Sequence, residues 1–125
     1  MATRTYLIHP SLFFSKGIEF AGWAADSPVN RRSLERFRSY YGCSPGVCSV
    51  LWDRICALCP RGYSFKHLLW ALMFLKVYGT ESVLVGKIGV DEDTYRDHMW
   101  PVVRAIASLK LQVVRYYYYL FIMLN

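Results

Sequence analysis

The hydrophobic pattern is most regular between residues 67 and 106, and the expected fold is built around this stretch. An apolar run covers Leu68 to Leu75 and continues to Gly79, and it is too hydrophobic for a helix with one face in water. Thr80 then opens a short second segment, which Gly89-Val90 closes. The pattern predicts a buried helix, a short helix and a glycine turn.

A third segment opens at Asp91, which is a good helix-capping residue. Pro101 lies inside this segment, cannot donate to the Asp97 carbonyl and disfavours helical geometry at Trp100, so we expect a kink or a break there. The apolar positions step by four, three, four and three residues along one helical face: Tyr95, Met99, Val102, Ile106 and Leu109. With the two preceding helices, this segment predicts a tri-helical, helix-turn-helix-like unit.

Two further helices are expected upstream, because Ser27-Pro28 and Ser44-Pro45 each place a capping hydroxyl before a proline suited to the first turn. Gly42 is the expected end of the first of them. That first helix carries an apolar face of Leu34, Phe37 and Tyr41. The second carries a core stripe of Val47, Leu51, Ile55 and Leu58, flanked by Cys48 and Trp52. Pro60-Arg61-Gly62 ends it, and Ser64 is expected to cap the buried helix.

These signals predict an all-α fold, a small bundle of about five helices that occupies residues 27–110. Residues 1–26 show no sustained period and are expected to form an irregular N-terminal arm. Residues 111–125 change in character to a run of tyrosines with an apolar end, and are interpreted as a divergent aromatic and apolar tail.

Composition narrows the class of protein. The 125 residues are 54% hydrophobic and 17% aromatic, which excludes a disordered chain. The net charge of +6 is compatible with nucleic acid or an anionic membrane surface as a partner. No segment reaches the roughly 20 apolar residues of a membrane span, and no secretory signal is evident. The four cysteines are therefore expected to be reduced, in a cytosolic or nuclear setting.

Basic residues cluster in the first expected helix, where four arginines fall within eight positions: Arg31, Arg32, Arg36 and Arg38. Guanidinium groups match phosphate oxygens well, so this cluster is a candidate phosphate-binding face. The alternative is a solvated helix face whose charge Glu35 partly offsets. In the helix-turn-helix-like unit, Lys87, Arg96 and Arg104 are further candidates, although Asp93 and Asp97 share the expected recognition face.

Little in the sequence supports a metal site or an active site. Cys43, Cys48, Cys56 and Cys59 could close a tetrahedral zinc site, but buried cysteines commonly act as small hydrophobes. The acidic cluster that begins at Asp91 is better explained by a helix N-terminus than by a divalent metal. His9, His67 and His98 show no ligand spacing and suit capping or partly exposed roles. No nucleophile–base pair or glycine-rich phosphate loop occurs, so neither an enzyme nor a cofactor is expected.

Two blocks resemble a known family: RFRSYYGCSPGVCSVLW, from Arg36 to Trp52, and the long stretch from Lys66 to Leu109. They are similar to the N-terminal helical region of eukaryotic PIF/Harbinger-like DDE transposases. The resemblance covers about Arg32 to Arg115. The framework positions that match are Leu68, Leu69, Trp70, Leu72, Phe74, Leu75, Tyr78, Gly89, Val90, Tyr95, Trp100 and Ile106.

The resemblance implies a helix-turn-helix-like DNA-binding domain that in the family precedes a catalytic RNase H-like domain. This chain departs from the family at 93–98, where two basic positions are acidic and a tryptophan is His98. After Arg115 it carries four tyrosines and no catalytic-domain sequence. We therefore expect a truncated, transposase-derived, non-catalytic protein of the nucleus that binds double-stranded DNA mainly through phosphates.

Two alternatives stay open. One is a helical interaction module that dimerises or binds a transposase partner, suggested by aromatic surface at Trp52, Trp100 and the tyrosine tail. The other is a non-functional transposon remnant.

Overall fold

The structure is a computed structural model that describes residues 6–24, 27–77 and 81–124, with side chains described for all of these except 81–82 and 110–124. The described residues form helices and no strand, which confirms the all-α prediction. The helices are α1 (Pro10–Phe20), α2 (Arg31–Tyr41), α3 (Pro45–Ile55), α4 (Phe65–Val77), α5 (Glu81–Ile88) and α6 (Glu92–Leu124), with a short 3-10 helix at Cys56–Leu58.

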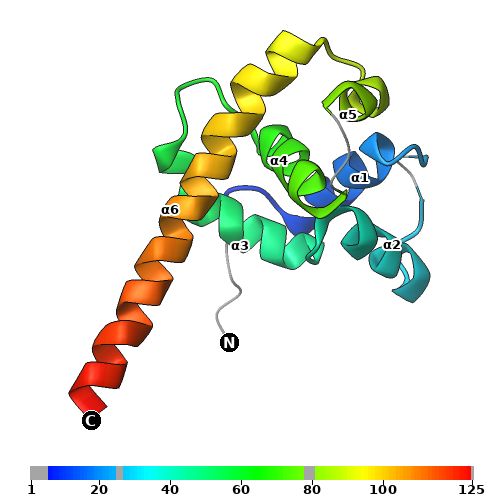
Figure 1. Cartoon of the computed structure of the whole chain (residues 1–125). Helices are drawn as coiled ribbons and strands as arrows, with labels where there is room; N and C mark the ends of the chain where they lie inside the picture. Colours follow the sequence, from blue (N-terminus) through cyan, green and yellow to red (C-terminus); the bar gives the residue numbers. More distant parts are fainter. Residues whose placement is uncertain (1–5, 25–26, 78–80, 125) are drawn as a thin grey trace.

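Helix α4 lies at the centre of the bundle and packs against α1, α2 and α6 (Figure 1). All seven residues from His67 to Met73 are buried. A helix enclosed on every side needs apolar residues around its whole circumference, which is why this part of the sequence shows no polar face. The predicted buried helix is confirmed for His67 to Met73, whereas Leu75 and Val77 near its end are each 39% exposed.

The helix-turn-helix-like arrangement of α4, α5 and α6 is also as predicted. Gly89 ends α5 with a φ of +84°, in the left-handed region that favours glycine. Asp91 then caps α6, since its carboxylate accepts from the Thr94 N–H at 2.7 Å. Tyr95, Met99 and Val102 are fully buried, and Ile106 and Leu109 are partly buried against the same core. The expected cap at Thr80 lies outside the described residues.

The N-terminal arm predicted for residues 1–26 is wrong for its central part, which forms α1. The signal was present at the start of this helix: the His9 ring accepts from the Ser11 N–H at 3.1 Å, and Pro10 occupies the first turn. Phe13, Phe14 and Ile18 are buried in the core. Buried residues occupy adjacent positions of α1 while the apolar Leu12 is exposed, so no single periodic face shows in the sequence.

Helix α2 begins later than predicted. Ser27-Pro28 is not its start; Ser27 instead donates its hydroxyl to the Ala24 carbonyl at 2.6 Å. Asn30 is the cap, and it forms a capping box with Ser33 in which each side chain accepts from the other's backbone N–H at 2.9 Å. The end at Gly42, with a φ of +80°, is as predicted.

The start of α3 at Ser44-Pro45 is confirmed, because the Ser44 hydroxyl accepts from the Val47 N–H. Its predicted core stripe is wrong at both ends: Val47 is 51% exposed, and Leu58, just beyond α3 in the 3-10 helix, is 53% exposed. The buried face consists of Cys48, Ser49, Trp52 and Ile55. That face is turned toward α1 and α6, so Trp52 belongs to the core and does not contribute to an aromatic surface.

No break occurs at Pro101, because α6 runs as one helix through it to Leu124. Its C-terminal half extends past the other helices (Figure 1). The residues predicted to form a separate tail, 111–124, are the end of this helix. Over the described part of the chain, no helix combines the length and apolarity needed to cross a bilayer.

Candidate nucleic-acid interface

The four arginines of α2 fall on two ridges of the helix. Arg32 and Arg36 are four residues apart, so they lie on one side, with Tyr40 one turn further on. Arg31, Glu35 and Arg38 lie on another side, where Arg31 Nε forms an ion pair of 3.2 Å with the Glu35 carboxylate. That pair is largely exposed and contributes little stability, but it offsets part of the charge on this ridge.

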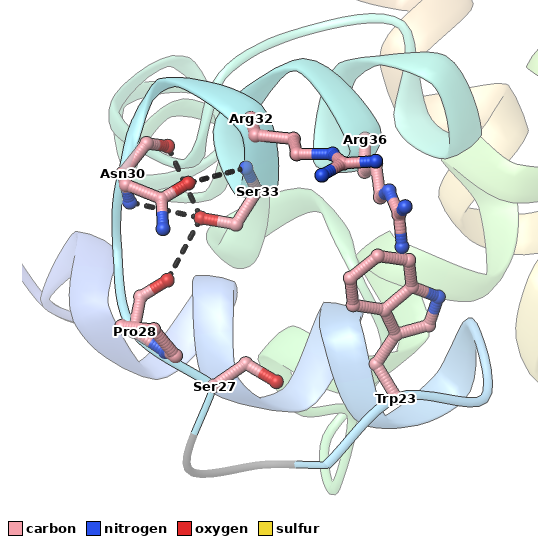
Figure 2. Close-up of a pocket in the computed structure, with 7 residues that line it drawn as sticks. All are labelled: Trp23, Ser27, Pro28, Asn30, Arg32, Ser33 and Arg36. Atoms are coloured by element: carbon pink, nitrogen blue, oxygen red, sulfur yellow. Dashed lines mark hydrogen bonds between the residues drawn. The ribbon is translucent and has the colours of Figure 1, made fainter.

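The Arg32–Arg36 ridge borders a pocket of about 240 Å³. Figure 2 shows both guanidinium groups at one rim, with the indole of Trp23 against Arg36 and Ser27 and Pro28 across the opening. The carbon at the centre of the Arg36 guanidinium lies 3.4 Å from the Trp23 ring centroid, which is a close cation–π contact. The lining residues are Trp23, Ser27, Pro28, Asn30, Arg32, Ser33 and Arg36.

The capping box fixes the wall of this pocket. Ser33 donates its hydroxyl to the Pro28 carbonyl at 2.9 Å, which ties the approach to α2 onto the first turn of the helix (Figure 2). The Asn30 side chain accepts a hydrogen bond from the Ser33 N–H and so caps that turn. The segment from Pro28 to Ser33 is thus pinned by side-chain hydrogen bonds, and the two arginines project from a rigid base.

None of the described carboxylates forms an ion pair with Arg32 or Arg36. Arg32 is exposed, while Arg36 is half-buried by its contact with Trp23. Two neighbouring guanidinium groups without a counter-charge repel each other, so the site carries a local positive potential suited to an anion.

Lys87 extends the same basic surface. Its ammonium nitrogen lies 5.3 Å from the centroid of the Tyr40 ring, so this side chain reaches from α5 to the C-terminal part of α2. Tyr40 stands one helical turn after Arg36 on the same ridge. Arg32 and Arg36 are therefore neighbours on α2 (Figure 2), and the Tyr40 ring lies between them and Lys87 on a line toward the end of α5. We call this line the basic ridge.

Arg96 and Arg104 do not join the basic ridge. Both lie on α6, and α2 and α6 lie on different sides of α4 (Figure 1). Arg96 faces Asp93 at 3.9 Å, and both Glu92 and Asp93 are exposed on the first turn of α6. The seven arginine and lysine residues predicted to touch DNA are thus divided among the basic ridge, the other side of α2 (Arg31 and Arg38) and α6, where the surface is partly acidic.

The acidic residue that precedes α6, Asp91, caps the helix. Hydrogen bonds from the Thr94 backbone and hydroxyl lower the pKa of Asp91 below its ordinary value, because they favour the charged carboxylate. In the described part of the chain, no group of three or more histidine, cysteine, aspartate or glutamate side chains is placed to hold a metal ion. The four cysteines therefore do not come together as a zinc site.

The histidines have structural roles. His67 Nδ1 accepts from the Ser64 N–H at 3.0 Å at the start of α4, and its ring stacks on His98 of α6 with centroids 4.5 Å apart. Burial, with the nearby charges of His98 and Lys66, lowers the pKa of His67 to about 4. The buried imidazole is neutral at physiological pH and joins α4 to α6.

Trp23 is the residue of this interface that the sequence did not indicate. It lies in a stretch without hydrophobic period, and its partner Arg36 is thirteen positions away. Only the fold of α1 against α2 brings them together.

Comparisons with protein-family models, with curated proteins and with solved structures found no match for this chain.

Proposed function

We propose that this is a transposase-derived, non-catalytic domain that binds duplex DNA through backbone phosphates on the basic ridge. The observation that carries the proposal is the pair of guanidinium groups of Arg32 and Arg36, which lie side by side without a carboxylate partner among the described residues. The transposase origin rests on the sequence resemblance alone.

The contact pattern follows from the chemistry of the ridge. A guanidinium group presents several N–H donors in one plane and can bond two oxygens of one phosphate. Trp23 holds the plane of Arg36, so less side-chain freedom is lost on binding. Lys87 supplies a third cation on the same line. Such contacts give affinity without reading base sequence.

The start of α6 is a poor partner for DNA. In a helix-turn-helix the first residues of the last helix enter the major groove. Here those residues include the exposed carboxylates of Glu92 and Asp93, which would be repelled by phosphates. The proposed DNA contact is therefore moved from the expected recognition helix to α2 and the end of α5.

Salt dependence of binding to random duplex DNA tests the proposal. Three phosphate contacts predict a slope of log affinity against log salt of about −2.7, since each contact contributes about −0.9. The double variant R32Q/R36Q should reduce the slope to about −0.9 and weaken binding at low salt. A slope near zero for the unaltered protein would reject DNA binding.

The matched control is R96Q/R104Q, which also removes two positive charges, but from α6. If binding depends on the basic ridge, this variant keeps a slope close to that of the unaltered protein. If the two double variants lose affinity equally, net charge alone explains binding and the assignment to the ridge is wrong.

The second candidate function is self-association through α6. The observation in its favour is that the C-terminal half of this helix extends beyond the bundle (Figure 1), in a sequence of four tyrosines followed by Leu-Phe-Ile-Met-Leu. Sedimentation at several protein concentrations tests it: a mass that rises with concentration supports association, and a constant monomer mass rejects it.

A further inference from the structure

Cys43 and Cys48 bring their sulfur atoms within 3.6 Å of each other at the junction of α2 and α3. Cys43 immediately precedes the cap residue Ser44, and Cys48 is the fourth residue of α3. These are the two positions that form a hydrophobic staple at the start of many helices. The local geometry of a capped helix therefore holds the two thiols together.

The two thiols differ in exposure. Cys43 is partly exposed, whereas Cys48 is fully buried. The pKa of Cys43 is lowered, first by the hydrogen bond from Cys48 and then by the charge of Arg38. The same hydrogen bond, together with burial, raises the pKa of Cys48. An accessible thiol beside a cation is the kind that reacts, and a buried neighbour is placed to trap the product.

We propose that Cys43 and Cys48 are a reversible oxidation site that hydrogen peroxide converts to an intramolecular disulfide. The Cys43 thiolate attacks one peroxide oxygen, so that a sulfur–oxygen bond forms, the oxygen–oxygen bond breaks and hydroxide leaves, to be protonated to water. Cys43 is then a sulfenic acid. Cys48 attacks its sulfur, the sulfur–sulfur bond forms, and the sulfenic oxygen leaves as a second water. Two thiols are oxidised and one peroxide is reduced to two waters.

The geometry requires only a small movement. A disulfide has a sulfur–sulfur distance of about 2 Å, so the two sulfur atoms, now 3.6 Å apart, must approach by about 1.6 Å. The bond would fix the turn at Gly42 to the first turn of α3. A thiol reductant reverses it by exchange.

The chain contains its own control in Cys56 and Cys59. These cysteines have the shorter spacing, which in sequence looks the better redox pair, and both are partly exposed. Among the described residues, no hydrogen bond joins their sulfur atoms; Cys56 instead points its thiol at the Asp53 carbonyl, 3.8 Å away.

The experiment uses the reduced full-length protein, hydrogen peroxide and a maleimide that labels the remaining thiols after denaturation. Trypsin cleaves after Arg38, Arg54 and Arg61, so one peptide, 39–54, carries Cys43 and Cys48, and the next, 55–61, carries Cys56 and Cys59. We expect peptide 39–54 to lose both labels and two hydrogen atoms in mass, while peptide 55–61 keeps both labels. Equal loss in the two peptides, disulfides between chains, or full labelling of 39–54 would overturn the proposal.

Two single variants test the order of the steps. In Cys48→Ala, dimedone should trap a sulfenic acid on Cys43, because no second thiol is at hand. In Cys43→Ser, the buried Cys48 should take up no dimedone. Dimedone on Cys48, or none on Cys43, would overturn the assigned roles. The peptide comparison in the unaltered protein does not depend on whether these variants fold.

Discussion

The Tyr63 hydroxyl donates a hydrogen bond of 2.6 Å to the main-chain carbonyl oxygen of Asp97. This is the carbonyl that Pro101 leaves without a helical donor, because proline has no N–H to offer four residues later. Tyr63 reaches it from the loop before α4. A side chain from elsewhere in the fold thus replaces the missing bond of α6, and the helix continues through its proline.

The two residues should therefore be energetically coupled. Tyr63→Phe removes the replacement bond and should lower the free energy of unfolding by about 1 kcal/mol. In a Pro101→Ala background, the N–H of the introduced alanine can itself serve the Asp97 carbonyl, so the same Tyr63→Phe change should cost much less. Urea unfolding of the four proteins gives the coupling energy. Equal costs in both backgrounds would show that Tyr63 does not compensate for the proline.

Gly17 marks the closest approach of α1 to α2. A Cβ added there would collide with the Phe37 ring and lie 3.0 Å from Tyr41 Cε2, and both rings are buried. Gly17→Ala should destabilise the fold by about 1–3 kcal/mol, despite the better helix propensity of alanine.

The matched control is Gly86→Ala in α5, where an added Cβ meets nothing within 4 Å. It should raise stability by up to about 1 kcal/mol, since alanine is the better helix residue. Chemical unfolding of the two variants measures whether the free energy of unfolding falls in the first and rises in the second. If Gly17→Ala were also stabilising, the close packing of α1 on α2 would be wrong.

The sequence predicted best where one signal controlled the local structure. The left-handed turns at Gly42 and Gly89 and the caps at Ser44 and Asp91 depend on residues next to each other, so their chemistry is visible in the chain itself. The buried nature of α4 was equally plain, because apolar residues cover its whole circumference.

The wrong predictions arose where two local signals competed or where the outcome depended on packing partners. Ser27-Pro28 and Ser44-Pro45 look alike as helix starts, but the Asn30–Ser33 capping box takes over in the first case. For α3, two apolar faces compete, and only contact with α1 and α6 selects the one with Cys48. The sequence predicted candidate arginines but not their division among different surfaces, because that division depends on which side of its helix each residue occupies and on which side of α4 each helix lies.

His67 should make the protein sensitive to acid. Its folded pKa of about 4 lies below the ordinary unfolded value of about 6.5, so the unfolded chain binds the proton first as pH falls. The stability contributed by the neutral ring is complete above pH 6.5 and is lost as pH falls toward and through 4. The total loss should be up to about 3 kcal/mol.

Denaturant unfolding at several pH values between about 7 and 4 measures this loss. Carboxylates titrate over the lower part of the same range, so the comparison is with His67→Gln, which does not titrate there and keeps an acceptor for the Ser64 N–H. The pH dependence should be clearly shallower in the variant. Parallel curves for the two proteins would contradict a buried neutral imidazole.

Trp23 should act on DNA binding through Arg36, without contributing any charge of its own. Trp23→Ala removes the ring against which the guanidinium rests, so Arg36 regains its side-chain freedom and must lose it again on binding phosphate. Affinity for random duplex should fall about 3- to 10-fold, and the salt slope should stay the same because the number of cations is unchanged. Trp23→Phe keeps a ring face and should recover most of the loss.

Arg36→Gln supplies the background that separates positioning from stability. If Trp23 works only by holding Arg36, then Trp23→Ala should have almost no further effect on affinity once Arg36 is gone. A full additional loss in that background would mean that the indole contacts DNA directly or that the bundle has loosened. Unfolding curves distinguish these, because only loosening lowers the denaturation midpoint enough to populate unfolded chains under the binding conditions.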